Sequence, residues 1–181
     1  MKPTAADLKA AEGRTVPDVV AANLRVLFCG INPGLWSGAT GRHFARPGNR
    51  FWKVLHGAGF TSRVLEPSEE EELLSCGLGI TNLSARTTAT AAELTKEELR
   101  EGAVLLEEKV ARLRPRFVAF LGMQAYRTAF DRPRATVGLL PEPVADAGAW
   151  LLPNPSGLQA RYQLADLVSF FEDLRRAVDL T

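Results

Sequence analysis

Short apolar segments alternate along the chain with longer stretches whose apolar residues recur at helical spacing. Each segment is four to seven residues long, and turn-forming or charged residues bound it, which is typical of a strand covered on both faces. We predict strands at residues 25–30, 79–83, 116–122 and 150–153. Because strands that alternate with helices form βαβ units, this order predicts an α/β fold with a mostly parallel sheet between helical layers.

Helical signals fill the intervals between these strands. Capping-box patterns stand at Ser68–Glu71 and at Thr95–Glu98. The second box opens a helix with one apolar stripe, made of Leu99, Ala103, Leu106, Val110 and Leu113. The last helix carries a similar stripe, made of Leu164, Leu167, Val168, Phe171, Leu174 and Val178. Shorter helices are predicted within residues 4–12, 50–59 and 123–130, with Asn49 as the cap of the second.

One interval lacks a helical pattern and predicts a long loop. Residues 32–48 contain four glycines and two prolines. Loops of this length in compact domains are usually functional or disordered. We therefore expect this loop to take part in binding.

The composition is that of one soluble domain. Of the 181 residues, 46% are apolar and 24% are charged. We expect a single domain over residues 1–181, with 1–22 as an N-terminal extension and 24–178 as the core. No apolar run approaches the roughly 18 residues of a membrane span, and the N-terminus lacks the apolar core of a signal peptide. We therefore expect no membrane contact and a cytoplasmic location.

The two cysteines and two histidines of the chain give little material for a metal centre. Cys29 and Cys76 lie in apolar or glycine-flanked contexts, which favour buried thiols over a disulfide. None of these side chains stands at the spacing of zinc ligands, and an iron–sulfur cluster needs about four thiolates. We expect no metal and no other cofactor.

Charge is unevenly distributed although the net charge is only +1. Residues 19–65 contain no acid but six basic residues, namely Arg25, Arg42, Arg46, Arg50, Lys53 and Arg63. Residues 110–134 carry six arginines against one acid, Asp131. Such asymmetry can give a nearly neutral protein one positive face. The alternative is a set of ordinary solvated helix faces.

Two of the predicted strands run into the same kind of turn. The first ends in Asn32-Pro-Gly34 and the last in Asn154-Pro-Ser-Gly157. In open α/β sheets, ligands bind outside the carboxyl ends of the strands, so these two remote segments can meet at one edge. The alternative is two unrelated turns, because Asn, Pro and Gly are common turn residues.

The side chains at this edge suit the recognition of a nucleobase. Asn32 is neutral, so it can orient a water but cannot act as a strong base. Asn82 and Thr88 can add polar contacts, and Phe44 offers a stacking surface unless it folds back into the core. The chain lacks the phosphate-binding, dinucleotide-binding, nucleophile-elbow and zinc-protease motifs. Arginine-rich flanks, an aromatic ring and polar amides together favour recognition of an extruded base.

Four motifs in this order carry a specific resemblance. They are Gly30–Gly34 (GINPG), Phe44–Ala45, Asn49–Lys53 (NRFWK) and Asn154–Leu158 (NPSGL). The chain resembles the mismatch-specific uracil-DNA glycosylase family, which includes thymine-DNA glycosylase, over residues 24–178. The resemblance implies a three-layer α/β/α sandwich with a short, mostly parallel central sheet.

The resemblance also implies roles for residues around the base. Asn32 matches the asparagine that positions the attacking water. Ile31 matches a backbone contact and Phe44 the aromatic ring that hold the flipped base. Asn82 and Thr88 resemble a polar wall, and Asn154 belongs to the second motif of the base site.

Other residues are implied to contact the DNA. Gly157 and Leu158 match the loop that enters the duplex, with Leu158 as the wedge that fills the space of the flipped base. Arg161 resembles an arginine that supports the wedge or contacts phosphate, although Gln159-Ala160 place it one residue later than in some relatives. Arg46 and Arg50 are further candidates for the DNA backbone.

The expected activity is monofunctional hydrolysis of the N-glycosidic bond of uracil, with thymine or damaged pyrimidines as further candidates. The expected partner is double-stranded DNA with a mismatched or damaged base, and the expected state is a monomer. Glu93 is a candidate auxiliary base, or alternatively a solvated first-turn acid that favours the helix dipole. Ala92 stands beside it, where some relatives have a polar residue. The alternative function is a non-catalytic module that binds DNA lesions or nucleotides.

Overall fold

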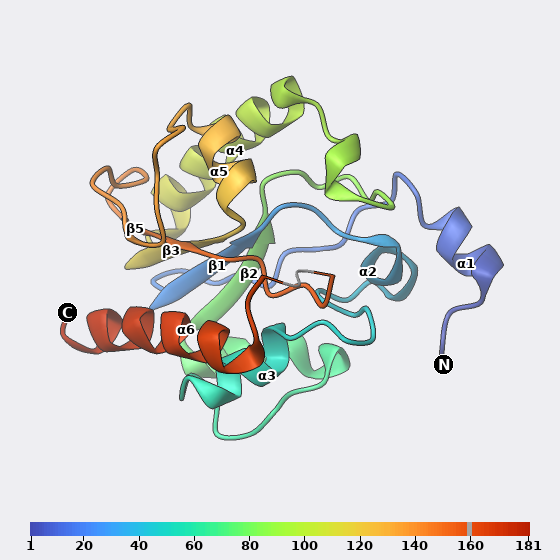
Figure 1. The fold of residues 1–181 in the computed structure, drawn as a ribbon, viewed down its shortest axis with the longest axis horizontal. Helices are drawn as coiled ribbons and strands as arrows, with labels where there is room; N and C mark the ends of the chain where they lie inside the picture. Colours follow the sequence, from blue (N-terminus) through green and yellow to red (C-terminus); the bar gives the residue numbers. More distant parts are fainter. Residues whose placement is uncertain (159–160) are drawn as a thin grey trace.

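A five-stranded sheet forms the centre of the computed structural model, which describes residues 1–158 and 161–181 (Figure 1). The strand order is β2-β1-β3-β5-β4. The strands are β1 (Val26–Gly30), β2 (Leu78–Asn82), β3 (Phe117–Leu121), β4 (Gly138–Leu139) and β5 (Gly148–Leu152). All pairs are parallel except β4 with β5. The predicted α/β class with a mostly parallel sheet is confirmed.

Helices cover both faces of this sheet and make three layers (Figure 1). One face carries α4 (Lys96–Leu113) and α5 (Met123–Ala129), and the other carries α3 (Phe51–Gly57) and α6 (Leu164–Asp179). Two further helices, α1 (Ala5–Ala10) and α2 (Leu35–Thr40), pack on each other. The 3-10 helices are η1 (Pro67–Cys76) and η2 (Ala91–Glu93).

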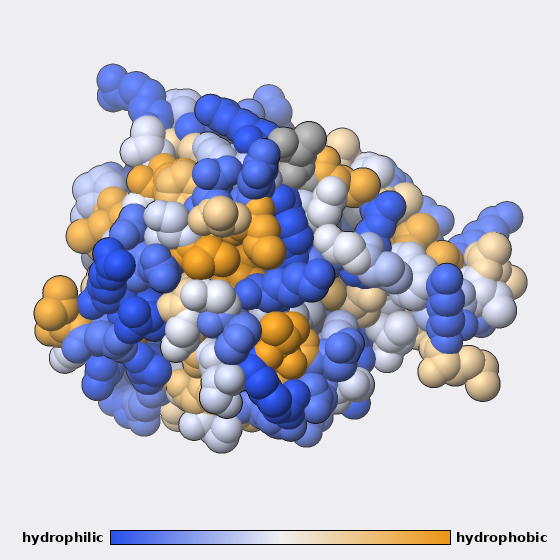
Figure 2. All heavy atoms as spheres, turned by 60° about the horizontal axis from the view of Figure 1, so that its bottom comes forward, coloured by the Kyte–Doolittle hydropathy of each residue, from blue (hydrophilic) through white to orange (hydrophobic). Residues whose placement is uncertain are grey.

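Successive residues of each central strand enter opposite halves of the core. Phe28 of β1 lies on the α3–α6 side. Its ring packs edge-on against Phe51, with ring centroids 5.6 Å apart, and stacks on Phe171, with centroids 6.0 Å apart. Its neighbours Leu27 and Cys29 lie on the α4–α5 side. Burial raises the pKa of the Cys29 thiol, whereas Cys76 is only half-buried. On the face shown in Figure 2, most of the surface is hydrophilic and apolar side chains form separate patches.

The segment predicted as a long loop contains the helix α2. Gly34 is its N-cap, and Gly41 ends it in the left-handed conformation with φ +70°. The glycines therefore delimit a short helix instead of extending a loop, because a left-handed residue is a common helix stop and glycine adopts it without strain.

The first acidic segment also differs from its prediction. It forms the 3-10 helix η1, and its capping box is Glu66 with Glu69 instead of Ser68 with Glu71. The predicted capping box of α4, Thr95 with Glu98, is confirmed. In α6, Leu164 is 40% exposed, so the buried stripe begins at Leu167.

The N-terminal segment joins the sheet and the loop that follows β2. Gly13 N–H donates to Thr87 O and Thr87 N–H donates to Arg14 O, both at 2.9 Å. Val19 forms an antiparallel bridge with Ile80 on the outer side of β2. Residues before the predicted core therefore hold part of the strand-end region in place.

Candidate active site

A cavity of about 480 Å³ lies at the carboxyl edge of the sheet. The chain passes from β1 to β2 on one side of the sheet and then to β3 on the other side of β1, and such a switch point is where open α/β sheets bind ligands. The residues predicted to hold a base all line this cavity together with Asn32, namely Ile31, Phe44, Asn82, Thr88 and Asn154. The two Asn-Pro turns do meet at one site.

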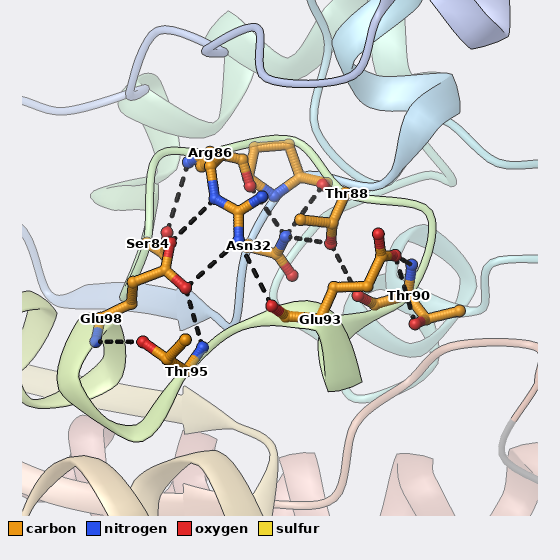
Figure 3. Close-up of polar contacts among 9 residues, drawn as sticks. Asn32, Ser84, Arg86, Thr88, Thr90, Glu93, Thr95 and Glu98 are labelled. Carbon is orange, nitrogen blue, oxygen red and sulfur yellow. Dashed lines mark hydrogen bonds and ion pairs between the residues drawn. The ribbon is translucent and has the colours of Figure 1, made fainter.

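The Asn32 amide is held by the loop that follows β2 (Figure 3). Its Nδ2 donates to Arg86 O at 2.8 Å, to Thr88 Oγ1 at 2.7 Å and, more weakly, to Pro33 O at 3.3 Å. Thr88 Oγ1 in turn donates to Thr90 O at 2.7 Å. These contacts occupy the donor side of the amide, and Oδ1 has no hydrogen-bond partner in residues 1–158 and 161–181. Asn32 therefore presents an acceptor to the cavity.

An ion pair between Arg86 and Glu98 supports the loop that follows β2. Arg86 Nε and Nη2 donate to the Glu98 carboxylate at 2.8 and 3.2 Å, and Thr95 N–H donates to the same carboxylate at 2.8 Å (Figure 3). The hydrogen bonds from Arg86, followed by that from Thr95, lower the pKa of Glu98 to about 2. Arg86 thus uses its side chain to fix the loop and its carbonyl to fix Asn32.

Glu93 is the last residue of the short helix η2, and its carboxylate is turned back to the N-cap residue Thr90. Its Oε2 accepts from Thr90 N–H at 2.7 Å, and the residue is exposed. Glu93 is not among the residues that line the cavity, whereas Thr88, Thr90 and Ala91 are. This geometry favours the first-turn role that the sequence left open, and an auxiliary-base role stays a prediction.

Phe44 forms part of the cavity wall, and its ring rests on the core. The ring stacks on Phe51 with centroids 4.0 Å apart and planes inclined by 29°. Phe44 is half-buried and has a φ of +51°, which is unusual for a bulky residue. Backbone strain of this kind persists where the surroundings enforce it, often at functional sites. The Phe44 ring therefore both packs on the core and lines the cavity, and its role as a stacking surface for a base stays a prediction.

The Asn82 amide lies over Gly30 and next to His43. A Cβ atom at position 30 would lie 2.5 Å from Asn82 Oδ1, so any larger residue at position 30 would displace the Asn82 amide. Asn82 Nδ2 lies 3.4 Å from His43 Nδ1. His43 is buried, and its backbone N–H donates to Glu70 Oε2 at 2.8 Å.

The loop after β5 is shaped by its own side chains. Asn154 Oδ1 accepts from Ser156 N–H at 2.9 Å, and Leu158 N–H donates to Ser156 Oγ at 3.3 Å. Gly157 lies so close to the segment between α2 and α3 that an added Cβ would be 2.4 Å from Gly48 O. Leu158 is 67% exposed and lines the cavity mouth. An exposed apolar side chain at this place fits the predicted wedge.

The arginines predicted to contact DNA occupy different environments. Arg46 is exposed and lines the cavity. Arg161 is exposed and lies over the Tyr162 ring at 5.4 Å. Arg50 is half-buried, and its guanidinium donates to the carbonyls of Pro155, Ser156 and Tyr162. Arg50 therefore holds Pro155 and Ser156 after β5 and Tyr162 before α6, and a phosphate contact by Arg50 stays a prediction.

The arginines of the second arginine-rich segment, residues 110–134, are not among the residues that line the cavity. Arg112 and Arg114 end α4, and Arg116 precedes β3, so they stand at the amino ends of the strands. The cavity is at the carboxyl ends. Only the first basic segment, residues 19–65, brings arginines to the site, and the expected positive face does not join both segments.

Some cavity residues have no clear signal in the sequence. Trp36 and Ser37 enter through the unpredicted helix α2, and His43 enters through its contact with Asn82. The glycines at both ends of α2 are the signal that could have located the helix. Within the described ranges, no group of three His, Cys, Asp or Glu side chains could hold a metal ion, and no helix has the length and apolar character to cross a bilayer.

Comparisons with known proteins agree with this geometry. A sequence model described as the uracil DNA glycosylase superfamily matches residues 17–175. The solution NMR structure of a candidate uracil DNA glycosylase from Methanosarcina acetivorans is similar with a TM-score of 0.60, over 90% of this chain and 98% of that one. The two sequences are 19% identical, so this likeness concerns the fold alone. The family match covers most of the chain, and the chain therefore belongs to the uracil DNA glycosylase superfamily, whose members are DNA glycosylases.

Proposed function

We propose that the protein is a monofunctional DNA glycosylase that flips uracil from mismatched double-stranded DNA and hydrolyses its N-glycosidic bond. The observation that carries this proposal is the Asn32 amide, whose donor side is bound to the loop at Arg86 and Thr88. Its Oδ1 acceptor is left to the cavity that Phe44 and Asn82 also line. A fixed acceptor beside a base-sized pocket is what a water-positioning group requires.

The reaction needs little base strength from the protein. The bond between uracil N1 and the sugar C1′ breaks with its electron pair on the base, which leaves an oxocarbenium-like sugar. A water that donates one hydrogen bond to Asn32 Oδ1 then adds its oxygen to C1′ and loses a proton to solvent. Because the sugar centre is highly electrophilic, positioning can replace a strong base.

The departing uracil anion needs donors where its charge develops. The backbone N–H of Phe44 has no hydrogen-bond partner in the described part of the chain and is one candidate donor. The Asn82 amide is another, because it lines the same cavity. The Phe44 ring would stack on the flipped base and hold it against these groups.

Hydrolysis by water, without a covalent amine intermediate, is supported by the cavity lining. No lysine is among the lining residues that the structure describes. Glycosylases that also cut the DNA strand need an amine nucleophile that forms a Schiff base with the sugar. We therefore expect an intact abasic strand as product and no borohydride-trapped protein–DNA adduct.

Selectivity for mismatches would come from the cost of base extrusion. A mispaired base costs less to flip than a paired one. Leu158 at the cavity mouth can enter the space that the flipped base leaves. Thymine carries the same hydrogen-bonding edge as uracil, so thymine opposite guanine belongs in the substrate test.

The deciding experiment measures abasic sites formed on duplexes that carry uracil opposite guanine, uracil opposite adenine or thymine opposite guanine. We expect fastest release from uracil opposite guanine and no release by Asn32→Ala. Binding to the uracil duplex without any abasic product from wild-type protein would instead support a non-catalytic lesion-binding module.

A further inference from the structure

We propose that His43 is a positioning residue that fixes the orientation of the Asn82 amide and so makes the base pocket select uracil over cytosine. This inference rests on the proposed glycosylase function. It concerns a contact within the pocket lining, between the loop that carries Phe44 and the end of β2.

The surroundings of His43 define which ring nitrogen carries a proton. His43 is 2% exposed, and its Nε2 lies 2.8 Å from Pro17 O. A carbonyl oxygen can only accept, so Nε2 carries the hydrogen. In the neutral ring the other nitrogen, Nδ1, is then an acceptor. It faces Asn82 Nδ2 at 3.4 Å.

This acceptor selects one of the two orientations of the Asn82 amide. The Nδ2 group donates one of its hydrogens to His43, which leaves Oδ1 on the side of Gly30. The inverted amide would place Oδ1 against the lone pair of His43 Nδ1, and a buried acceptor facing an acceptor is costly. Asn82 therefore offers the cavity one acceptor, Oδ1, and the second hydrogen of Nδ2.

That pattern fits uracil and opposes cytosine. Uracil has a donor at N3 and an acceptor at position 4, so Oδ1 can accept from N3–H while Nδ2 donates to O4. Cytosine has an acceptor at N3 and a donor at position 4, so it requires the inverted amide. His43 thus excludes the wrong base because it repels the inverted Asn82 amide, in addition to the attraction between the correctly oriented amide and uracil. Thymine shares the uracil pattern and is not excluded by this contact.

His43 is also held through its main chain. Its backbone N–H donates to Glu70, a residue only 3% exposed, and Arg42 Nη1 contacts the same carboxylate at 3.3 Å. Pro17 belongs to the N-terminal segment that pairs with β2. His43 is therefore fixed by groups from three parts of the chain, its ring by Pro17 and Asn82 and its backbone by Glu70, and the ring cannot easily turn to offer Asn82 a donor.

The test uses two substitutions that each keep one ring nitrogen. In His43→Gln the side-chain amide reaches the Nε2 position, so the Pro17 contact can persist while the acceptor for Asn82 is lost. In His43→Asn the side-chain oxygen occupies the Nδ1 position, so the acceptor persists while the Pro17 contact is lost. A purely structural role predicts equal losses or a greater loss in His43→Asn.

The readout is the ratio of single-turnover excision rates for 5-fluorouracil and 5-fluorocytosine, each placed opposite an abasic site. Fluorine makes both bases better leaving groups, and neither is paired, so the two substrates differ in their hydrogen-bonding edge. We expect His43→Gln to lower the ratio by about tenfold or more, since unmatched buried polar groups discriminate strongly. We expect His43→Asn to keep most of the ratio. An unchanged ratio in His43→Gln, or an equal loss in both variants, overturns the proposal.

Two measurements keep the test decisive if a variant folds poorly. In an Asn82→Ala background, His43→Gln should change the ratio no further, because His43 acts through Asn82. On the wild-type protein, ¹⁵N NMR should show Nε2 of His43 protonated and Nδ1 unprotonated, and a protonated Nδ1 would refute the orientation argument. Wild-type protein that fails to release uracil at all refutes the proposed function instead, which separates the two failures.

Discussion

Asn32 works through the direction of its amide, since it carries no charge. Three acceptors occupy Nδ2, and the group that remains for chemistry is Oδ1. The same orientation would be lost if the loop at Arg86 and Thr88 moved, because two of the three acceptors belong to it. The position of the Asn32 amide therefore depends on the segment that follows β2.

Removal of the Asn32 side chain should abolish most excision. A single positioning contact of this kind is worth roughly a hundredfold or more in rate. We expect Asn32→Ala to lose at least this factor in single-turnover excision, with affinity for uracil-containing duplex largely retained. Rates within a few-fold of wild type would show that another group positions the water.

Phe44 gives a second prediction at the scale of one residue. If its ring stacks on the flipped base, Phe44→Ala should weaken the productive complex by about 1–3 kcal/mol. Phe44→Leu should recover part of this through apolar contact. The control is Phe44→Gly, which removes the same ring but relieves the positive φ. Equal loss of excision in the Ala and Gly variants, despite different melting temperatures, identifies stacking, whereas loss that follows the melting temperature identifies core packing.

Glu98 gives a prediction for how the stability of the fold depends on pH. Its pKa in the folded state, about 2, is below the ordinary 4.5 because Arg86 and Thr95 donate to the carboxylate. A lowered pKa contributes stability that is present above pH 4.5 and is lost as the pH falls towards 2. We expect Glu98→Gln to unfold at lower urea than wild type at pH 7, and the difference to shrink between pH 4.5 and 2. A difference that stays constant over this range would contradict the contribution of the ionised pair.

At the scale of elements, Arg46 and Arg50 can be compared directly. Arg46 lies in the segment before α3, and Arg50 is the N-cap of α3. Arg46 is exposed at the cavity, whereas Arg50 donates to the carbonyls of Pro155, Ser156 and Tyr162. A phosphate contact adds about −0.9 to the log–log dependence of binding on salt. We expect Arg46→Gln to flatten that dependence by about this amount.

Arg50→Gln should instead slow excision from duplex DNA, with the salt dependence unchanged, because the loop that carries Leu158 loses its support. Fluorescence binding titrations over a range of salt concentrations, run beside duplex excision rates, distinguish the two residues. A flattened salt dependence in Arg50→Gln and not in Arg46→Gln would reverse the assignment.

The sequence predicts the central elements well because their signals are local. The apolar runs of β1 and β3 and the Thr95–Glu98 box each lie within one element. The sequence does not predict elements whose formation depends on tertiary contacts. The two-residue strand β4 exists only by pairing with β5, and α2 is a single short helix between glycines.

The candidate site shows the same division. The resemblance names Asn32, Phe44 and Leu158, and the structure gathers them in one cavity. His43 and Glu70 could not be found in the same way, because the hydrogen bonds of His43 join residues 26 positions or more apart. For Arg50, the sequence shows a cation in a basic segment, and only the fold reveals that carbonyl groups of a distant loop bind it.

At the scale of the whole molecule, the loops after β1 and β5 meet around Gly48 and Gly157 and place Leu158 at the cavity mouth. If Leu158 fills the vacated base position, it offsets part of an unstacking cost of a few kcal/mol, which arises only in duplex DNA. Leu158→Ala should therefore slow excision from duplex uracil more than from single-stranded uracil. The measurement is the ratio of the two rates, and an unchanged ratio would exclude a wedge role.

The two edges of the sheet have a consequence for how the protein behaves at high concentration. An exposed edge strand offers unpaired N–H and C=O groups to a second chain, and proteins avoid this with short or covered edges. Here Val19 exchanges both backbone hydrogen bonds with Ile80 on the outer side of β2, and the opposite edge is the two-residue strand β4. Neither edge leaves a long row of groups for strand addition. The segment that supports the base pocket through Pro17 thus also shields the sheet against aggregation through β2.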